Sequence, residues 1–242
     1  MIELTNVTKS FNSGRPNQFT AVRDVSLVIE PGRVTVLKGP SGSGKTTLLS
    51  LIGCMARPSS GRIRLRGVRA PFLPDGAEGP GFDVSGLPER FLTSIRRETF
   101  GFIFQQFNLV KGITVIENVM LPAYPTGEGR TSARDRVLGL LDMFGIARHA
   151  ASRVEHLSGG ELQRTAIARA LVNNPAAIIA DEPTAHLDSA LSIEFMDIVG
   201  RLKSEGKTVI IASHDPLVYG SGLADRVVEM RDGLVTDTGD TE

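Results

Sequence analysis

Short apolar runs recur along this chain, and stretches with helical spacing separate them. Four of these runs are mostly apolar, and each is followed by a polar residue: 34–37, 100–104, 177–180 and 208–212. Runs of this kind indicate strands that are buried on both faces, as in a parallel sheet. Because such strands alternate with helical stretches, the pattern predicts an α/β core.

Three further segments predict strands outside this core. Their residues are 2–7, 20–30 and 62–66, and we expect them to form a flanking antiparallel sheet. The sequence then turns helical between 113 and 153. The apolar face of that region, which we expect to pack in a core, consists of Val137, Leu138, Leu140, Leu141 and Phe144.

Residues 69–86 fit neither pattern. Several prolines and glycines interrupt any regular structure there. The segment is either a loop that contacts a partner or an insertion tolerated at the surface, and we favour the insertion.

Residues 39–46 read Gly-Pro-Ser-Gly-Ser-Gly-Lys-Thr and match the phosphate-binding pattern G-x-x-x-x-G-K-[ST]. They lie between a predicted strand and an apolar helical stretch at 47–53. Glycines in this context let backbone N–H groups surround phosphates, and the helix N-terminus adds further donors. Lys45 would reach the β- and γ-phosphates, and the Thr46 hydroxyl would bind Mg²⁺. A glycine-rich turn that binds nothing is the alternative, and the motif alone leaves kinases, GTPases and other ATPases open.

The strand at 177–180 ends in two acidic residues, Asp181 and Glu182. Ligands of open α/β sheets bind at the carboxyl ends of the strands. We therefore expect Asp181 to hold Mg²⁺ through water. The competing interpretation is a helix N-cap, since acidic residues are common there and Pro183 follows.

A second glycine pair precedes the helical run at 162–171. It lies in Leu157-Ser158-Gly159-Gly160-Glu161, where Ser158 is a candidate N-cap. The glycines remove side chains where a phosphate could approach the helix N-terminus. Since residues 39–46 already hold phosphates from one side, this second helix end suggests a site shared between two subunits. An ordinary capped helix is the alternative.

Five motifs in this order resemble those of the ABC ATPases, the motor subunits of ABC transporters. They are 39–46, Gln105, 157–161, 178–182 and 213–215. The resemblance covers nearly the whole chain. It implies a P-loop NTPase (RecA-like) core with a flanking antiparallel β subdomain and an inserted α-helical signature subdomain. The stretches 101–109 and 114–119 further resemble the macrolide-efflux and lipoprotein-release branch.

The resemblance implies one ABC ATPase domain over 1–242 with three lobes. The expected lobes are an antiparallel β lobe at about 1–32 and 60–70, a P-loop core at about 33–105 and 165–242, and a helical subdomain at about 106–164.

Catalytic roles follow from the resemblance residue by residue. Glu182 occupies the position of the general base that activates water. His214, after the strand at 208–212, resembles the switch histidine that contacts the γ-phosphate. Gln105 would contact Mg²⁺ or the attacking water and sense the membrane partner, with Gln106 as the alternative if the assignment slips by one. Lys45 completes the catalytic set.

Nucleotide contacts also follow from the resemblance. Phe11 would stack on adenine, although an isolated Phe is more often a core residue. Asp188 fits the D-loop, which crosses the dimer interface, and His186 is an unusual occupant that we expect to be tolerated. Glu161 replaces the Gln that is more common in the family, and we expect no loss of function from this difference. The full set of expected nucleotide contacts is Phe11, Gly39, Pro40, Ser41, Gly42, Ser43, Gly44, Lys45, Thr46, Thr47, Ser158, Gly159, Gly160, Glu161 and Asp188, and the expected metal contacts are Thr46, Gln105 and Asp181.

Composition restricts the function classes. The chain has 242 residues, of which 41% are hydrophobic, enough for one substantial core. Basic and acidic residues number 27 each, which argues against a nucleic-acid-binding sleeve or a polybasic membrane anchor. The single cysteine, Cys54, excludes an internal disulfide, fits a reducing cytosol and is expected to pack. We expect neither a signal peptide nor an apolar run of the about 20 residues that a membrane span needs.

We therefore expect an ATPase that binds ATP and Mg²⁺, pairs with a second copy of itself and drives separate integral membrane permease subunits. It would lie in the cytoplasm on the inner face of the membrane, without nucleic acid. The alternative is a mechanical or regulatory ABC ATPase that moves no cargo. Soluble ABC ATPases of DNA repair or translation fit less well, since they generally carry two cassettes or large insertions, and a P-loop kinase would leave residues 157–161 and Glu182 without a purpose.

Overall fold

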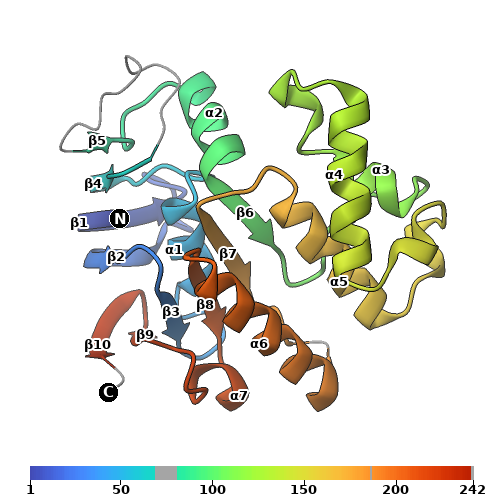
Figure 1. The fold of residues 1–242 in the computed structure, drawn as a ribbon. Helices are drawn as coiled ribbons and strands as arrows, with labels where there is room; N and C mark the ends of the chain where they lie inside the picture. The colour runs from blue at the N-terminus through green and yellow to red at the C-terminus, as the bar shows by residue number, and fades with distance from the viewer. Residues whose placement is uncertain (69–80, 186, 241–242) are drawn as a thin grey trace.

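The chain folds into two β-sheets and a group of helices beside the larger sheet (Figure 1). The structure, a computed structural model, describes residues 1–68, 81–185 and 187–240, apart from the side chains of 237–240. The strands are β1 (Ile2–Phe11), β2 (Phe19–Ile29), β3 (Val34–Lys38), β4 (Ser60–Leu65), β5 (Phe82–Asp83), β6 (Phe100–Ile103), β7 (Ala177–Asp181), β8 (Thr208–Ser213), β9 (Arg226–Arg231) and β10 (Leu234–Asp240). The helices are α1 (Lys45–Ile52), α2 (Glu89–Thr99), α3 (Val115–Met120), α4 (Arg130–Met143), α5 (Gly159–Leu171), α6 (Ser189–Ser204) and α7 (Pro216–Tyr219).

The smaller sheet is antiparallel, with strand order β2-β1-β4-β5. The larger sheet has the order β10-β9-β3-β8-β7-β6, in which β9 to β6 run parallel and β10 pairs antiparallel with β9. The predicted strands of both sheets are confirmed. Because β3, β8, β7 and β6 are parallel neighbours, the segments that follow them emerge at one common edge of the sheet.

Alternation along the central strands divides the apolar side chains between two cores. Leu37, Ile179 and Ile210 belong to the core that contains residues of α1 and the smaller sheet. Their neighbours in sequence face the other side, where the strands pack against α6. A strand buried on both faces needs apolar residues at every position, which explains the continuous runs in the sequence.

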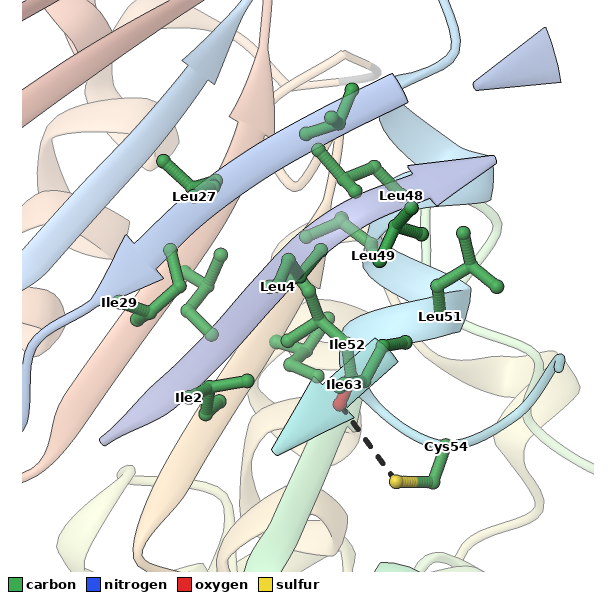
Figure 2. Close-up of a cluster of buried hydrophobic side chains, with 14 of the residues drawn as sticks. Ile2, Leu4, Leu27, Ile29, Leu48, Leu49, Leu51, Ile52, Cys54 and Ile63 are labelled. Carbon is green, nitrogen blue, oxygen red and sulfur yellow. Dashed lines mark hydrogen bonds between the residues drawn. The ribbon is translucent and has the colours of Figure 1, made fainter. Parts of the chain in front are cut away.

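Helix α1 lies between the two sheets. Leu48, Leu51 and Ile52 are fully buried there and pack with residues of the smaller sheet such as Leu4 and Ile63 (Figure 2). The same cluster contains Cys54, whose thiol contacts the Ile52 carbonyl oxygen at 3.9 Å. Burial raises the pKa of this thiol to about 12, so Cys54 packs as expected and is held as an unreactive neutral thiol.

A third core holds α3, α4 and α5 together, and Figure 1 shows these helices grouped beyond β6. Val137 and Leu141 of α4 are fully buried, whereas Phe144 is only partly buried against the cluster. The predicted apolar face of this region therefore packs in a core, as expected. Among the described residues, no helix has both the length and the apolar character that a membrane span requires.

Several elements were missing from the sequence interpretation, among them helix α2 and the β9–β10 hairpin. Helix α2 buries only Leu92, Ile95 and Thr99, and its remaining positions are largely charged, so its apolar signal is weak. The β9–β10 hairpin turns at Asp232-Gly233 with positive φ at both residues, a recognisable hairpin signal. Of the irregular segment 69–86, residues 69–80 lie outside the described residues, and Phe82–Asp83 forms β5 on the edge of the smaller sheet.

Replacing Leu51 by Ala tests the position of α1 between the sheets. Because Leu51 is fully buried, Leu51→Ala should lower the free energy of unfolding by about 2–5 kcal/mol. Ile193→Ala is the control, since Ile193 is 54% exposed and its loss should change stability by less than about 0.5 kcal/mol. Urea denaturation followed by circular dichroism measures both; equal effects of the two variants would contradict this packing.

Candidate functional site

Most of the residues expected to perform catalysis meet at the carboxyl edge of the larger sheet. The phosphate-binding loop, residues 39–46, follows β3, and Asp181 is the last residue of β7. His214 follows β8, the strand between those two. The parallel register sets Lys38 beside Ser213 and Asp181 beside Ala212, so the three strands end at the same level. Segments far apart in sequence thereby converge on one site.

The phosphate-binding loop is enclosed by backbone from two other segments. A Cβ atom added at Gly39 would lie 2.2 Å from the carbonyl oxygen of Met230, and one at Gly44 would lie 2.3 Å from that of Ala21. Gly44 also has φ of 103°, a conformation that favours glycine. The backbone N–H of Gly233 donates a hydrogen bond of 3.0 Å to the Ser43 carbonyl oxygen. Glycine is therefore required on steric grounds at the first and last glycines of the loop.

The groups inside the loop fit a triphosphate. Ser43 is 3% exposed and its Oγ atom has no hydrogen-bond partner, as expected of a donor prepared for a ligand. Lys45 is 5% exposed, and its Nζ donates to the Gly39 and Pro40 carbonyl oxygens at 2.7 and 3.1 Å. A buried ammonium group and an unpaired hydroxyl within one glycine-rich loop suit a polyanion with several acceptor oxygens.

Glu182 lies between a cation and an imidazole. Its Oε1 is 3.3 Å from Lys45 Nζ, and its Oε2 is 2.9 Å from His214 Nδ1. The residue is 9% exposed and has φ of 46°, an uncommon value for a non-glycine residue. Its backbone N–H donates to the Ala212 carbonyl oxygen of β8 at 2.9 Å. The sheet edge thus holds this carboxylate in a strained and well-defined position next to the phosphate loop.

Thr46 and Asp181 form the other contact across the site. The Thr46 hydroxyl donates to Asp181 Oδ1 at 3.1 Å. Burial raises the pKa of the Asp181 carboxyl, and the charge of Glu182 adds to the rise, while the Thr46 hydrogen bond and Lys45 oppose it. Within the described residues there is no cluster of three His, Cys, Asp or Glu side chains placed to hold a metal. One hydroxyl and one carboxylate suit Mg²⁺, which takes its remaining ligands from phosphates and water.

Gln105 is exposed and lies two residues beyond the end of β6. The loop that follows it is held by Arg169, a residue of α5 that the sequence interpretation missed. The Arg169 guanidinium donates to the carbonyl oxygens of Phe107 and Asn108, both at 2.6 Å. Phe107 and Asn108 have φ of 58° and 49°, so these two hydrogen bonds stabilise an unusual backbone. An arginine inside the apolar part of a helix was the available signal.

The second glycine pair lies elsewhere, at the start of α5. Ser158 caps the helix, and its N–H and Oγ both donate to Glu161 Oε2, at 2.9 and 2.8 Å. The Cβ of a residue at 160 would meet Leu191 of α6 at 2.8 Å, so this helix end packs on α6. Ser158 and Gly159 are exposed. The structure therefore does not bring residues 158–161 into the group formed by Lys45, Thr46, Asp181, Glu182 and His214.

Glu161 is additionally held by residues from a 3₁₀ turn, Ala147–His149. Its Oε1 lies 2.8 Å from His149 Nε2 and 3.3 Å from the Arg148 guanidinium. The hydrogen bonds from Ser158, with smaller contributions from Arg148 and His149, lower the pKa of the Glu161 carboxyl to about 2. The first turn of α5 is thus fixed by an ionised carboxylate at its N-terminus.

The remaining expected nucleotide contacts lie on elements other than α5. Asp188 is the N-cap of α6, where its carboxylate accepts from the Leu191 N–H at 2.9 Å, and His186 lies outside the described residues. Thr47 is half-buried in α1. Phe11 ends β1 and stacks on Phe19, a second aromatic that the sequence interpretation missed, with 5.2 Å between the ring centroids.

A protein-family model described as ABC transporter matches residues 22–185. The chain belongs to the ABC transporter family. It is an ATP-binding cassette, an ATPase that acts on ATP with Mg²⁺, and the predicted P-loop NTPase fold is confirmed.

Curated relatives support the predicted branch. The macrolide export ATP-binding/permease protein MacB of Hyphomonas neptunium is 40% identical over 243 residues, which include 100% of this chain. MacB of Salmonella choleraesuis is 40% identical over 97% of the chain. The chain spans about a third of the length of these relatives, 35% and 34% respectively.

Solved structures agree with the fold over its full extent. The dimeric structure of MJ0796, a bacterial ABC transporter cassette, is 37% identical with a TM-score of 0.85 and covers 100% of this chain and 99% of that one. A dimeric post-hydrolysis state of MJ0796 bound to ADP and Pi is 36% identical, also with a TM-score of 0.85. Both similarities extend over 100% of this chain and 99% of the MJ0796 chain.

Replacing Glu161 by Gln tests the charge at the start of α5. Since the folded pKa is depressed to about 2, the carboxylate stabilises the fold fully above its ordinary pKa, near 4.3, and loses that effect as the pH falls toward 2. Glu161→Gln should therefore be less stable than the wild type at pH 7, and the gap should narrow below about pH 4.5. Urea denaturation at pH 7, 4 and 3 measures the gap; a difference that stays constant over this range would contradict the prediction.

Proposed function

We propose that this chain is the ATP-hydrolysing subunit of a transporter, in which two copies close around two ATP–Mg sites and drive a membrane permease. One observation carries the proposal. The phosphate loop, Asp181, Glu182 and His214 would form half of a hydrolytic site, while the exposed start of α5, at Ser158 and Gly159, lies apart from it. A second chain would supply the missing half.

The loop at 39–46 and the start of α1 would bind the phosphates. The backbone of Gly39, Pro40, Ser41, Gly42, Ser43 and Gly44 would cradle the β- and γ-phosphates, with Thr46 and Thr47 at the helix N-terminus. Lys45 would exchange its two loop carbonyl partners for phosphate oxygens. Thr46, Asp181 and Gln105 would hold Mg²⁺, which neutralises phosphate charge when bound.

Hydrolysis would depend on Glu182. Its Oε2 would take the proton of the attacking water, and His214 would hold that carboxylate and reach toward the γ-phosphate. Lys45 lies on the other carboxylate oxygen, so the same cation orients both the base and the phosphate. Catalysis is then mostly positioning and charge stabilisation.

The opposite copy would complete each site. Ser158, Gly159 and Gly160 would present N–H groups at the N-terminus of α5, and Glu161 would fix that turn. Asp188, at the N-cap of α6, would lie across the interface between the copies. The dimeric arrangement of MJ0796, to which this chain is similar over its whole length, supports this assembly.

The membrane partner is proposed from the relatives. MacB is described as an ATP-binding/permease protein, and this chain corresponds to about a third of its length. A permease, whether joined to this chain or separate, would hold it at the cytoplasmic face of the membrane. Within the chain we propose the division already expected from the sequence: a β lobe at 1–32 and 60–70, a core at 33–105 and 165–242, and a helical lobe at 106–164.

Replacing Glu182 by Gln tests the base. Gln keeps the shape of the side chain but cannot take a proton, so turnover should fall by about 10²–10⁴. ATP binding should persist, and an ATP-bound dimer should accumulate at twice the monomer mass of 26.0 kDa. Phosphate release and size-exclusion chromatography with light scattering measure both quantities. The control is Glu205→Gln, an exposed carboxylate beyond α6; hydrolysis near the wild-type rate in Glu182→Gln would remove Glu182 from this role.

Purification of the chain from its native cells in mild detergent tests the transport proposal. We expect a stoichiometric integral membrane protein to accompany it. A partner with a membrane-embedded pathway would support cargo transport, whereas one with only an extracytoplasmic enzyme domain would favour mechanical relay. A soluble or nucleic-acid partner without any membrane protein would contradict transport and leave the ATPase chemistry.

A further inference from the structure

Phe19 is a large aromatic side chain that is not buried in the hydrophobic core. It is 56% exposed and lies at the first position of β2. Its ring stacks on that of Phe11, with 5.2 Å between centroids and 20° between the ring planes. The two residues face each other in the register of β1 and β2, so the sheet itself holds the pair together.

The position of Phe19 relative to the phosphate loop is set by the backbone of β2. The carbonyl oxygen of Ala21 lies 2.3 Å from the point where a Cβ atom at residue 44 would be. Phe19 is two residues before Ala21 in an extended strand, about 7 Å away along the chain. A triphosphate in the loop would therefore leave its nucleoside within reach of the aromatic pair.

Lys9 is the second neighbour of the Phe11 ring. Its Nζ lies 5.2 Å from the centre of the Phe11 ring and donates to the Arg57 carbonyl oxygen at 2.8 Å. Phe11, which is half-buried, thus already has a cation and an aromatic ring against it. Phe19 offers the more exposed aromatic surface of the two.

We propose that Phe19 is a second base-stacking residue and that Phe11 and Phe19 together form the platform for the nucleobase. The inference rests on the proposed binding of a nucleoside triphosphate at residues 39–46. The spacing of the two rings is that of a direct stack, so the base lies against the pair and not between its members. Stacking requires only a π face, so Phe19 contributes affinity for any base without selecting adenine.

Equilibrium titration of Phe19→Ala with Mg²⁺ and three probes tests this role. The probes are ATP, GTP and inorganic tripolyphosphate, which lacks a base. Loss of one stacking surface should weaken ATP and GTP by similar factors, about 5- to 150-fold each. The affinity for tripolyphosphate should stay within about two-fold, because the phosphate loop is unchanged. Phe19→Tyr should restore most of the loss and Phe19→Leu should not, since only Tyr retains the aromatic face.

Controls separate the base contact from folding and from the proposed function. Tyr124→Ala removes another aromatic, 51% exposed, and should leave all three affinities unchanged. Melting temperatures should match between Phe19→Leu and the wild type. Unchanged ATP affinity in Phe19→Ala would overturn the role of Phe19 alone, as would an equal loss for tripolyphosphate. Failure of the wild type to bind any of the probes would instead overturn nucleotide binding at residues 39–46.

Discussion

The close approach of three backbone segments at the phosphate loop is the constraint on which the rest of the site depends. The carbonyl oxygens of Ala21 and Met230 lie only 2.3 and 2.2 Å from where the Cβ atoms of side chains at Gly44 and Gly39 would be. The smaller sheet and the β9–β10 hairpin are thereby seated directly on the loop. This contact also places α1 between the sheets, where its apolar face joins the largest core. The conformation of the phosphate loop and the packing of the elements around it therefore depend on the same contacts.

Charge placement follows from the same geometry. The parallel register brings the ends of β3, β7 and β8 to one level, and this sets Glu182 between Lys45 and His214. A buried ammonium group must be compensated, and here loop carbonyls and a carboxylate compensate it. Those partners are also the groups that a phosphate would replace or use. The arrangement therefore stabilises the loop while keeping its cation available for exchange.

Local signals predicted much of this structure, and contacts distant in sequence explain what they missed. The four central strands and the Ser158 N-cap follow from apolar runs and capping chemistry within a few residues. Phe19 and Arg169 could not be assigned in that way. Phe19 becomes notable only beside Phe11 across the hairpin, and Arg169 only when its partners, 61 and 62 residues earlier, are known. Local pattern thus identified the loops of the site, while the side chains that support them required the fold.

Helix α5 connects two parts of the proposed mechanism. Its first turn carries the glycine pair, and Arg169, about 15 Å further along the helix, grips the loop after Gln105. The loop cannot shift relative to α5 without breaking two hydrogen bonds to a guanidinium that is 9% exposed. Arg169 therefore ties the position of this loop to that of α5. In the proposed dimer, α5 would thus link the loop after Gln105 to the glycine pair that completes the site of the second copy.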